Sequence, residues 1–144
     1  MQTDATGILD DLVNQFSDPM SCLRELIQNA IDAGSGEVEI DVKWSQEADG
    51  GLLTVHVDDF GEGMTREIIE TKLTRLFSSG KDEDFTKIGR FGIGFVSVFA
   101  LAPFLVCVDT GRAGEYWRVL FKEDRTFDLI ALETPVEGTQ IRIF

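Results

Sequence analysis

Three short segments carry the residues most able to do chemistry, and the first of them has helical spacing. Glu25, Asn29 and Asp32 are separated by four and three positions, which places them on one face of a helix. A glutamate can act as a general base toward water, and an amide oxygen is a neutral ligand for a hard cation such as Mg2+. An ordinary solvent-exposed helix face has the same spacing, so this segment alone does not assign a function.

The second segment follows an apolar alternating run and contains Asp59, Gly61 and Gly63. A carboxylate at the end of a strand can accept a hydrogen bond from an exocyclic amine, such as that of adenine. Glycines beside it let the backbone approach a ligand closely. A simple turn between a strand and a helix has the same composition.

The third segment contains Gly89, Gly92 and Gly94 and leads into an apolar run that begins at Phe95. Free amides and the helix dipole make a glycine-rich helix N-terminus favourable for phosphate. The segment lacks the Gly-Lys-Ser/Thr of a Walker loop, and it does not open a βαβ unit. A flexible hinge would have similar glycines.

Hydrophobic periodicity predicts the elements that position these segments. A helix near residues 5–16 precedes a second helix, which Asp18 and Pro19 start and Gly34 ends. A third helix is expected from Thr65 to about Phe77. Strands are expected in a hairpin over 37–58 and near 104–109, 115–121, 126–132 and 139–144, and a helical run is expected from Phe95 to Ala102. The sum is a single α+β domain over 1–144, a two-layer sandwich of helices on a mostly antiparallel mixed sheet.

Composition and charge exclude several classes of function. The net charge is −13, so the surface repels phosphate backbones and no nucleic-acid partner is expected. Any anionic ligand must be held by local devices, such as a metal ion, backbone amides or a helix N-terminus. No apolar run approaches the ~20 residues that cross a bilayer, and the N-terminus has no signal-peptide pattern. No membrane association and a cytoplasmic location are therefore expected. Cys22 and Cys107 are expected to be buried thiols, and His56 is expected to be a strand residue.

Taken together and in this order, the three segments resemble those of a known group of proteins. The stretches 23–33 (LRELIQNAIDA), 59–65 (DFGEGMT) and 88–97 (IGRFGIGFVS) resemble the GHKL ATPase superfamily, whose nucleotide site is called the Bergerat fold. That group includes gyrase, the ninety-kilodalton heat-shock chaperones, histidine kinases and mismatch-repair proteins. The likeness is strongest to the chaperone branch. It spans about residues 8–144, with Gly138 and Thr139 resembling the closing motif.

The resemblance implies ATP and Mg2+ as cofactors and gives the residues of the first segment their roles. Glu25 is implied as the general base that activates the attacking water. Asn29 is implied to coordinate Mg2+ and bridge it to the phosphates. Asp32 is implied to support the site, either near the nucleotide or by packing the helix.

The resemblance also implies a base subsite and a phosphate subsite. Asp59 is implied to hold the adenine amino group, and the glycines at 61 and 63 allow close approach. Met64 is implied to lie against the adenine ring, and Thr139 to reach the base through water. Amides of Gly92, Gly94 and Phe95 are implied to bind the phosphates. Residues 78–89, with Ser78, Ser79 and Lys81, are implied to form the ATP lid, and Lys81 could reach a phosphate.

Three functions remain open at this stage. The first is an ATPase of the chaperone-like branch, in which lid closure accompanies hydrolysis. The second is an ATP-driven binding switch with little hydrolysis in isolation. The third is a kinase-type domain, which the general base at Glu25 disfavours. The chain is shorter than the nucleotide domains of the chaperones, and it is expected to be the N-terminal piece of a longer protein. A following domain or a dimer partner is expected to supply a basic residue.

Overall fold

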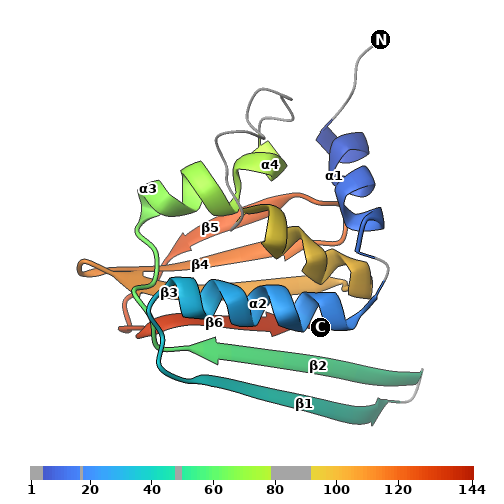
Figure 1. The fold of residues 1–144 in the computed structure, drawn as a ribbon, viewed down its shortest axis with the longest axis horizontal. Coiled ribbons are helices and arrows are strands. Elements are labelled where there is room, and N and C mark those ends of the chain that lie inside the picture. The colour runs from blue at the N-terminus through green and yellow to red at the C-terminus, as the bar shows by residue number, and fades with distance from the viewer. Residues whose placement is uncertain (1–4, 17, 48–49, 79–91) are drawn as a thin grey trace.

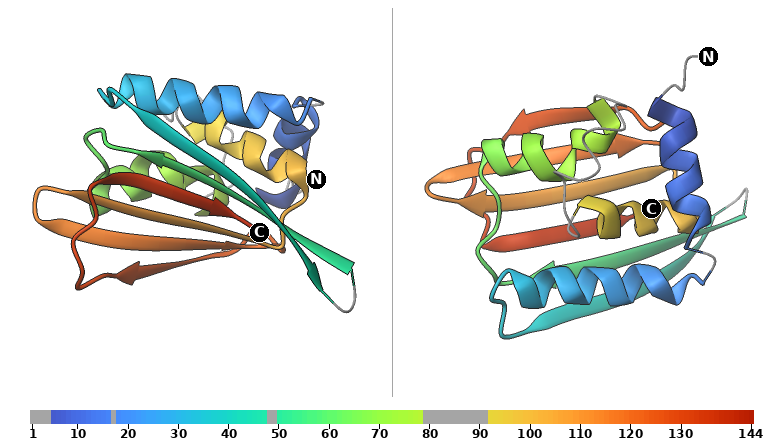
Figure 2. Two further views of the ribbon diagram at one scale, coloured as in Figure 1. Left: turned by 90° about the horizontal axis from the view of Figure 1, so that it is seen from below. Right: turned by 45° about the horizontal axis from the view of Figure 1, so that its top comes forward.

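A six-stranded antiparallel sheet is covered on one face by helices. The structure, a computed structural model, describes residues 5–16, 18–47, 50–78 and 92–144. Figures 1 and 2 show every helix on the same side of the sheet, which confirms the predicted α+β sandwich. The helices are α1 (Ala5–Asn14), α2 (Met20–Asp32), α3 (Arg66–Ile68), the π-helical turn η1 (Ile69–Leu73), α4 (Arg75–Ser78) and the 3-10 helix η3 (Val96–Leu101). The strands are β1 (Val38–Glu47), β2 (Gly50–Asp59), β3 (Leu105–Arg112), β4 (Glu115–Lys122), β5 (Phe127–Ala131) and β6 (Gly138–Ile143).

The last strand is inserted into the middle of the sheet. The strand order is β1-β2-β6-β3-β4-β5, and every neighbouring pair is antiparallel. The sequence analysis expected a mostly antiparallel mixed sheet, but the described strands include no parallel pair. β6 pairs Thr139 with Asp59 on β2 and with Thr110 on β3. The insertion therefore brings three residues that are far apart in the sequence into one row across the sheet.

Alternation along the central strands builds the core between the two layers. Side chains of one parity point toward the helices and are buried, as strands with one covered face require. Phe95, Phe99 and Phe121 pack as an aromatic cluster, with ring centroids 5.1–6.4 Å apart. The helix-facing core residues of the sheet are Val55, Val57, Val106, Val108, Val119, Phe121, Ile141 and Ile143.

Local hydrogen bonds set both ends of α2 where the sequence predicts them. At the start, the Met20 amide donates to Asp18 Oδ1 at 2.9 Å. At the end, Gly34 has a φ of +77°, and its amide donates to the Ile31 carbonyl. The Ser35 amide donates to the Ala30 carbonyl at 3.0 Å, which completes a Schellman motif. Both ends of α2 are therefore held by the local signals that the sequence carries.

Two helical expectations need correction. The segment after Thr65 is not one α-helix, because it passes through the π-helical turn η1 between α3 and α4. The Thr74 amide and hydroxyl both reach the Ile69 carbonyl, five residues back, and this widens the turn. The later helix already includes residues 92–95 and tightens to a 3-10 helix at Val96. It ends at Ala102, with a φ of 52°, before Pro103.

The other expectations about single residues concern the thiols, His56 and membrane spans. Cys22 and Cys107 are buried and free, as predicted, and burial raises the pKa of the Cys22 thiol to about 12. His56 lies on β2 between Asp41 and Arg142 of the neighbouring strands. Within the described ranges, no helix is long and apolar enough to cross a membrane.

Candidate functional site

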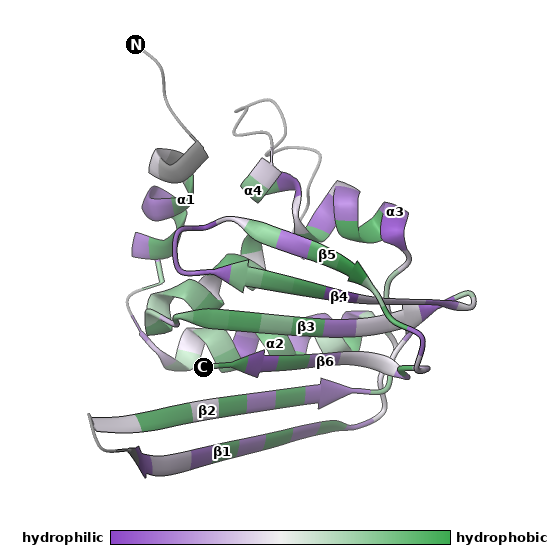
Figure 3. Ribbon diagram, turned by 180° about the vertical axis from the view of Figure 1, so that it is seen from behind, coloured by the Kyte–Doolittle hydropathy of each residue, from purple (hydrophilic) through white to green (hydrophobic). Residues whose placement is uncertain are grey.

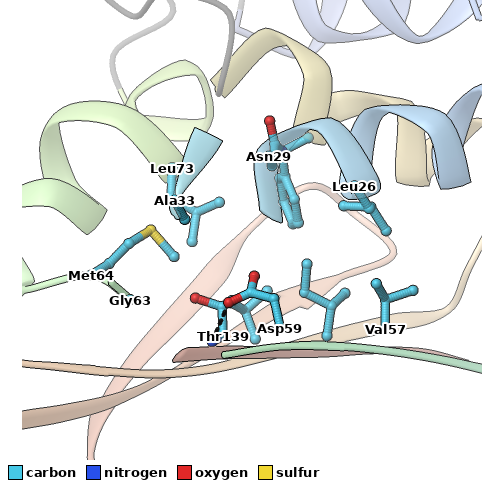
Figure 4. Close-up of a pocket in the computed structure, with 12 residues that line it drawn as sticks. Leu26, Asn29, Ala33, Val57, Asp59, Gly63, Met64, Leu73 and Thr139 are labelled. Atoms are coloured by element: carbon cyan, nitrogen blue, oxygen red, sulfur yellow. Dashed lines mark hydrogen bonds between the residues drawn. The ribbon is translucent and has the colours of Figure 1, made fainter. Parts of the chain in front are cut away.

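A cavity lies between α2 and the centre of the sheet, at the row formed by β2, β6 and β3. Figure 4 shows Leu26, Asn29 and Ala33 of α2 on one side of it and Asp59 and Thr139 rising from the sheet on the other. The lining residues are Leu26, Asn29, Ala33, Val57, Asp59, Gly63, Met64, Leu73, Phe95, Val108, Thr139 and Ile141. Most of this lining is apolar and a few polar groups converge on it, which is the usual character of a small-molecule pocket.

Asp59 is the one carboxylate among these lining residues, and backbone amides fix its orientation. Its Oδ1 accepts hydrogen bonds from the Gly61 amide at 3.0 Å and the Thr139 amide at 3.1 Å. Burial raises the pKa of Asp59, and the two amides act in the opposite direction. Among the described residues no donor reaches Oδ2. That oxygen is therefore able to accept a hydrogen bond from a ligand in the cavity.

A buried hydroxyl, that of Thr110, ties the strands and the glycine loop together beneath the cavity. Its Oγ1 accepts from the Met64 amide at 2.9 Å and donates to the Gly138 carbonyl at 3.1 Å. It also lies 2.9 Å from Thr139 Oγ1. For both of these bonds to form together, the single Thr110 proton goes to Gly138 and the Thr139 hydroxyl donates to Thr110. Thr139 Oγ1 is then left to accept hydrogen bonds from a ligand or a water.

The two glycines of the loop after Asp59 are required by space. A Cβ on Gly61 would lie 2.6 Å from the Ala33 carbonyl oxygen, and the Glu62 amide donates to that same oxygen at 2.9 Å. Gly63 has a φ of +69°, and a Cβ there would overlap the Gly111 carbonyl oxygen. The loop is therefore packed tightly between the end of α2 and β3, which positions Met64 at the cavity.

Asn29 connects this cavity to a second, more open one. It is only 7% exposed and lines both, yet its side-chain amide has no hydrogen-bond partner among the described residues. The amide is therefore free to bind a ligand or water at this position. The second cavity adds Asp32 and two basic residues, Lys72 and Arg112. Asp32 is exposed and accepts from Gln28 Nε2 at 2.9 Å, so it does not pack the helix into the core.

Glu25 lies apart from both cavities, beside the glycine-rich turn. A Cβ on Gly94 would lie 2.6 Å from Glu25 Oε2. The Glu25 carboxylate therefore occupies the space that a side chain at position 94 would need. Glu25 also lines a separate hollow on the outer side of α2, with Phe16 and Arg24. The fold thus brings Glu25 to Gly94 but does not bring it into the cavity of Asp59.

The third segment is described from Gly92 onward. Gly92, Gly94 and Phe95 belong to the first helical turn after the undescribed stretch, and all three are buried. Phe95 lines the cavity and also packs in the core. Lys81, Gly89 and the predicted lid from residue 79 onward lie outside the described residues, whereas Ser78 ends α4.

Three residues at the site were missed by the sequence analysis, namely Thr110 beneath the first cavity and Lys72 and Arg112 in the lining of the second. Thr110 gives a signal, because it is the polar member of the apolar helix-facing series Val106, Val108, Thr110. Lys72 and Arg112 give no such signal, since their approach to Asn29 depends on how three separate elements pack.

Few protein oxygen atoms at the described site could bind a metal ion. The described residues contain no cluster of three or more His, Cys, Asp or Glu that could hold a metal ion. The unpartnered amide of Asn29 fits a Mg2+ ion that takes most of its ligands from phosphate and water, as Mg2+ usually does.

Comparisons with known proteins agree with this geometry. The family model for histidine kinase-, DNA gyrase B- and HSP90-like ATPases matches residues 17–121, which include α2, the glycine loop and the turn at 92–95. A protein named chaperone protein HtpG, from Pseudoalteromonas translucida (strain TAC 125), is 32% identical over 140 aligned residues. That alignment covers 79% of this chain but 22% of the relative, so the chain spans about a fifth of that protein's length.

The family match covers well over half of the chain and includes all three of the segments that carry candidate chemistry. Thr139 lies beyond the matched range and joins the site through the pairing of β6 with β2. The chain belongs to the family of histidine kinase-, DNA gyrase B- and HSP90-like ATPases, and it is an ATP-binding, ATPase-like domain of that family.

Proposed function

We propose that this domain binds ATP with Mg2+ in the cavity beneath α2 and hydrolyses it, in the manner of a chaperone-like ATPase. The observation that carries the proposal is the convergence of Asn29, Asp59, Met64 and Thr139 on one cavity from three separate parts of the chain. Each of these residues was expected at the site from the family resemblance.

The base subsite is proposed at Asp59 and Thr139. The adenine amino group would donate to Asp59 Oδ2, while Oδ1 stays bound to the Gly61 and Thr139 amides. Thr139 Oγ1 would accept from a water or from the amine, since its own proton is committed to Thr110. Met64 would cover one face of the ring. This pairing of acceptors with an amine is supported by the hydrogen-bond directions around the cavity.

The phosphate subsite is proposed between Asn29 and the helical turn at 92–95. Asn29 would hold Mg2+, and the ion when bound would neutralise phosphate charge. The amides of Gly92, Gly94 and Phe95 would donate to phosphate oxygens, because the first-turn amides of a helix have no intrahelical acceptor. Lys72 and Arg112 line the second cavity, but Asp32 and Glu62 line it too, and Arg112 Nη1 lies 3.7 Å from Glu62 Oε2. The ion and the backbone amides are therefore proposed as the local devices that offset the net charge of −13.

Glu25 is proposed as the base that orients and deprotonates the attacking water. Its contact with Gly94 supports this role, since the same turn is proposed to hold phosphate. Closure of the lid over 78–89, with Lys81 reaching a phosphate, is part of the proposal and is supported by the family resemblance. A basic residue from a following domain or a dimer partner would complete the phosphoryl-transfer site.

The proposal is tested by measuring ATP binding and Mg2+-dependent phosphate release for the wild type and for Glu25→Ala. We expect both proteins to bind ATP and only the wild type to release phosphate above background, because the substitution removes the base but leaves the cavity of Asp59 intact. The wild-type rate is expected to be low without a further basic residue. Binding without turnover in either protein would contradict hydrolysis by this chain and would favour the ATP-driven switch.

A further inference from the structure

β1 is an edge strand, because β2 is its one neighbour among the described strands. It is ten residues long, whereas the opposite edge strand, β5, has five. A long edge presents a row of free backbone N–H and C=O groups that can pair with another strand. Figure 1 shows β1 along the margin of the sheet, with no element beyond it.

The helix-facing side of β1 exposes an unusual amount of apolar surface. Ile40, Val42 and Trp44 are 41%, 55% and 66% exposed, and Leu53, which faces Trp44 on β2, is 49% exposed. The β2 residues that face Ile40 and Val42 are buried, so the cover over the sheet stops one strand short of the edge. These four adjacent residues form a continuous apolar patch, and such patches mark interaction surfaces more often than isolated exposed residues do.

The opposite side of β1 carries charges of both signs. Glu39, Asp41 and Lys43 point away from the helices, and Figure 3 shows this face of the sheet without any helical cover. Lys43 Nζ lies 3.4 Å from Asp41 Oδ2, and both side chains are more than half exposed. The two groups pair with each other within one copy, and their exposure leaves both able to contact a strand that pairs with β1.

We propose that β1 pairs antiparallel with β1 of a second copy of this chain, with Val42 on the two-fold axis. In that register Asp41 of each copy lies opposite Lys43 of the other, so two ion pairs form across the interface. On the helix-facing side, Ile40 of each copy lies opposite Trp44 of the other. Opposite charges and aromatic–aliphatic pairs are the cross-strand pairs that stabilise antiparallel sheets.

The charges select this register over its neighbours. A shift of one pairing step toward the start of the strand places Asp41 opposite Asp41, although it also places Glu39 opposite Lys43. A shift in the other direction places Lys43 opposite Lys43 and Glu39 opposite Glu47. A two-step shift toward the start of the strand places Glu39 opposite Asp41. Like charges directly opposite one another are destabilising, so each of these alternatives is disfavoured. Among these registers, the one with Val42 on the axis is distinguished because it brings opposite charges together and places no like charges opposite each other within β1.

The resulting assembly is a closed dimer with one continuous sheet. Six strands from each copy join into a single sheet, and the helices of both copies lie on the same face, because antiparallel pairing about a two-fold axis keeps each residue on its own face. Only one surface patch is used by both copies, so assembly stops at two. A single added strand pair buries less surface than a standard interface, and two copies at −13 repel each other, so the association is weak.

The test is sedimentation equilibrium of the full chain over a range of micromolar concentrations, with a charge-exchange series at the edge. We expect the wild type to shift from one copy to two as concentration rises. Asp41→Lys places like charges opposite Lys43 and should abolish the shift, and Lys43→Asp should do the same. The double variant D41K/K43D restores opposite charges in the same register and should restore the dimer.

A matched control separates the register from net charge. Glu67→Lys changes an exposed residue on α3 by the same charge as Asp41→Lys and should leave the dimer unchanged. Thermal unfolding of every variant checks that the fold is intact. A wild type that stays monomeric throughout, a double variant that fails to regain the dimer, or a mass that grows beyond two copies would each overturn the proposal. The last outcome would point to pairing of β1 with β5.

Discussion

At the scale of single residues, Asp59 shows how one side chain serves both the fold and the site. One carboxylate oxygen is used for structure, because it joins the glycine loop to β6 through the Gly61 and Thr139 amides. The other is left free to accept from a ligand. Since burial raises the pKa of Asp59, keeping this group ionised in the folded state has a cost in stability. Function and stability are therefore opposed at this position.

Asp59→Asn should keep the fold and lose the ligand. The asparagine oxygen can still accept from both amides, and the buried charge is gone, so the variant should be at least as stable as the wild type at neutral pH. Its amide nitrogen would face the adenine amine donor to donor. Loss of a hydrogen bond to a charged group is worth about 1.5–3 kcal/mol, or roughly 10- to 100-fold in Kd. Calorimetric titration measures the loss of ATP affinity, and thermal unfolding measures the retained stability. An unchanged ATP affinity would refute the assignment of Asp59 to the base subsite.

The pH dependence of this effect has a definite sign. A carboxyl whose pKa is raised on folding adds stability that is present below its unfolded pKa and is lost as pH rises through the raised folded pKa. The wild type should therefore lose this contribution as pH rises from the acid range, and Asp59→Asn should not. ATP affinity should change in the opposite direction, because only the ionised group accepts the amine. Unfolding and binding curves for both proteins across the acid range provide the measurement.

At the scale of elements, the glycine loop after β2 depends on crowding as well as on backbone conformation. At Gly63, with a φ of +69°, an added Cβ would overlap the Gly111 carbonyl oxygen, whereas Gly114 has a φ of +78° and nothing within 4 Å of the same position. The two glycines share the left-handed conformation and differ in the space around them. They form a matched pair for separating the two effects.

Gly114→Ala should cost about 1–2 kcal/mol of unfolding free energy, the usual penalty for an L-residue in the left-handed region. Gly63→Ala should cost about 1–3 kcal/mol more, because the added methyl group overlaps β3. Urea unfolding of both variants measures the difference. Equal losses of unfolding free energy in the two variants would mean that the loop moves to make room for the methyl group. That result would contradict the conclusion that tight packing of the loop positions Met64 at the cavity.

The sequence predicted the elements around the site well and their internal geometry less well. The ends of α2 followed from Asp18 and Gly34, because these are local signals that act within one turn. The π-helical turn η1 did not, since Thr74 bonding to the Ile69 carbonyl depends on packing against the core. The pairing of Asp59 with Thr139 could not be predicted either, because the insertion of β6 between β2 and β3 depends on contacts between residues far apart in the sequence.

At the scale of the whole molecule, the net charge of −13 opposes any polyanionic ligand. The described part of the site offers one side-chain amide and no cluster of carboxylates for a metal, and its basic residues Lys72 and Arg112 are balanced by Asp32 and Glu62 in the same cavity. Mg2+ is therefore expected to carry much of the work of neutralising the phosphates. The family resemblance named the cofactors, but the charge balance explains why the ion is needed here.

Removing Mg2+ should weaken ATP binding and leave adenosine binding unchanged. Adenosine has the same base and sugar and no phosphates, so it isolates the subsite at Asp59. With ATP and Mg2+ at about 100 times Kd, ligand linkage adds about 2.7 kcal/mol to the unfolding free energy. Thermal unfolding with each ligand, with and without EDTA, measures this. An equal loss for adenosine and ATP on chelation would contradict the assignment of the ion to the phosphates.

The central claim is that the cavity between α2 and the row of Asp59, Thr139 and Thr110 holds the nucleotide base. A crystal structure of the chain with Mg2+ and a non-hydrolysable ATP analogue tests it most directly. We expect the exocyclic amine within hydrogen-bond distance of Asp59 Oδ2, the ring against Met64, and Asn29 on the metal ion. A base bound outside this cavity, or phosphates distant from Asn29 and the turn at 92–95, would contradict it.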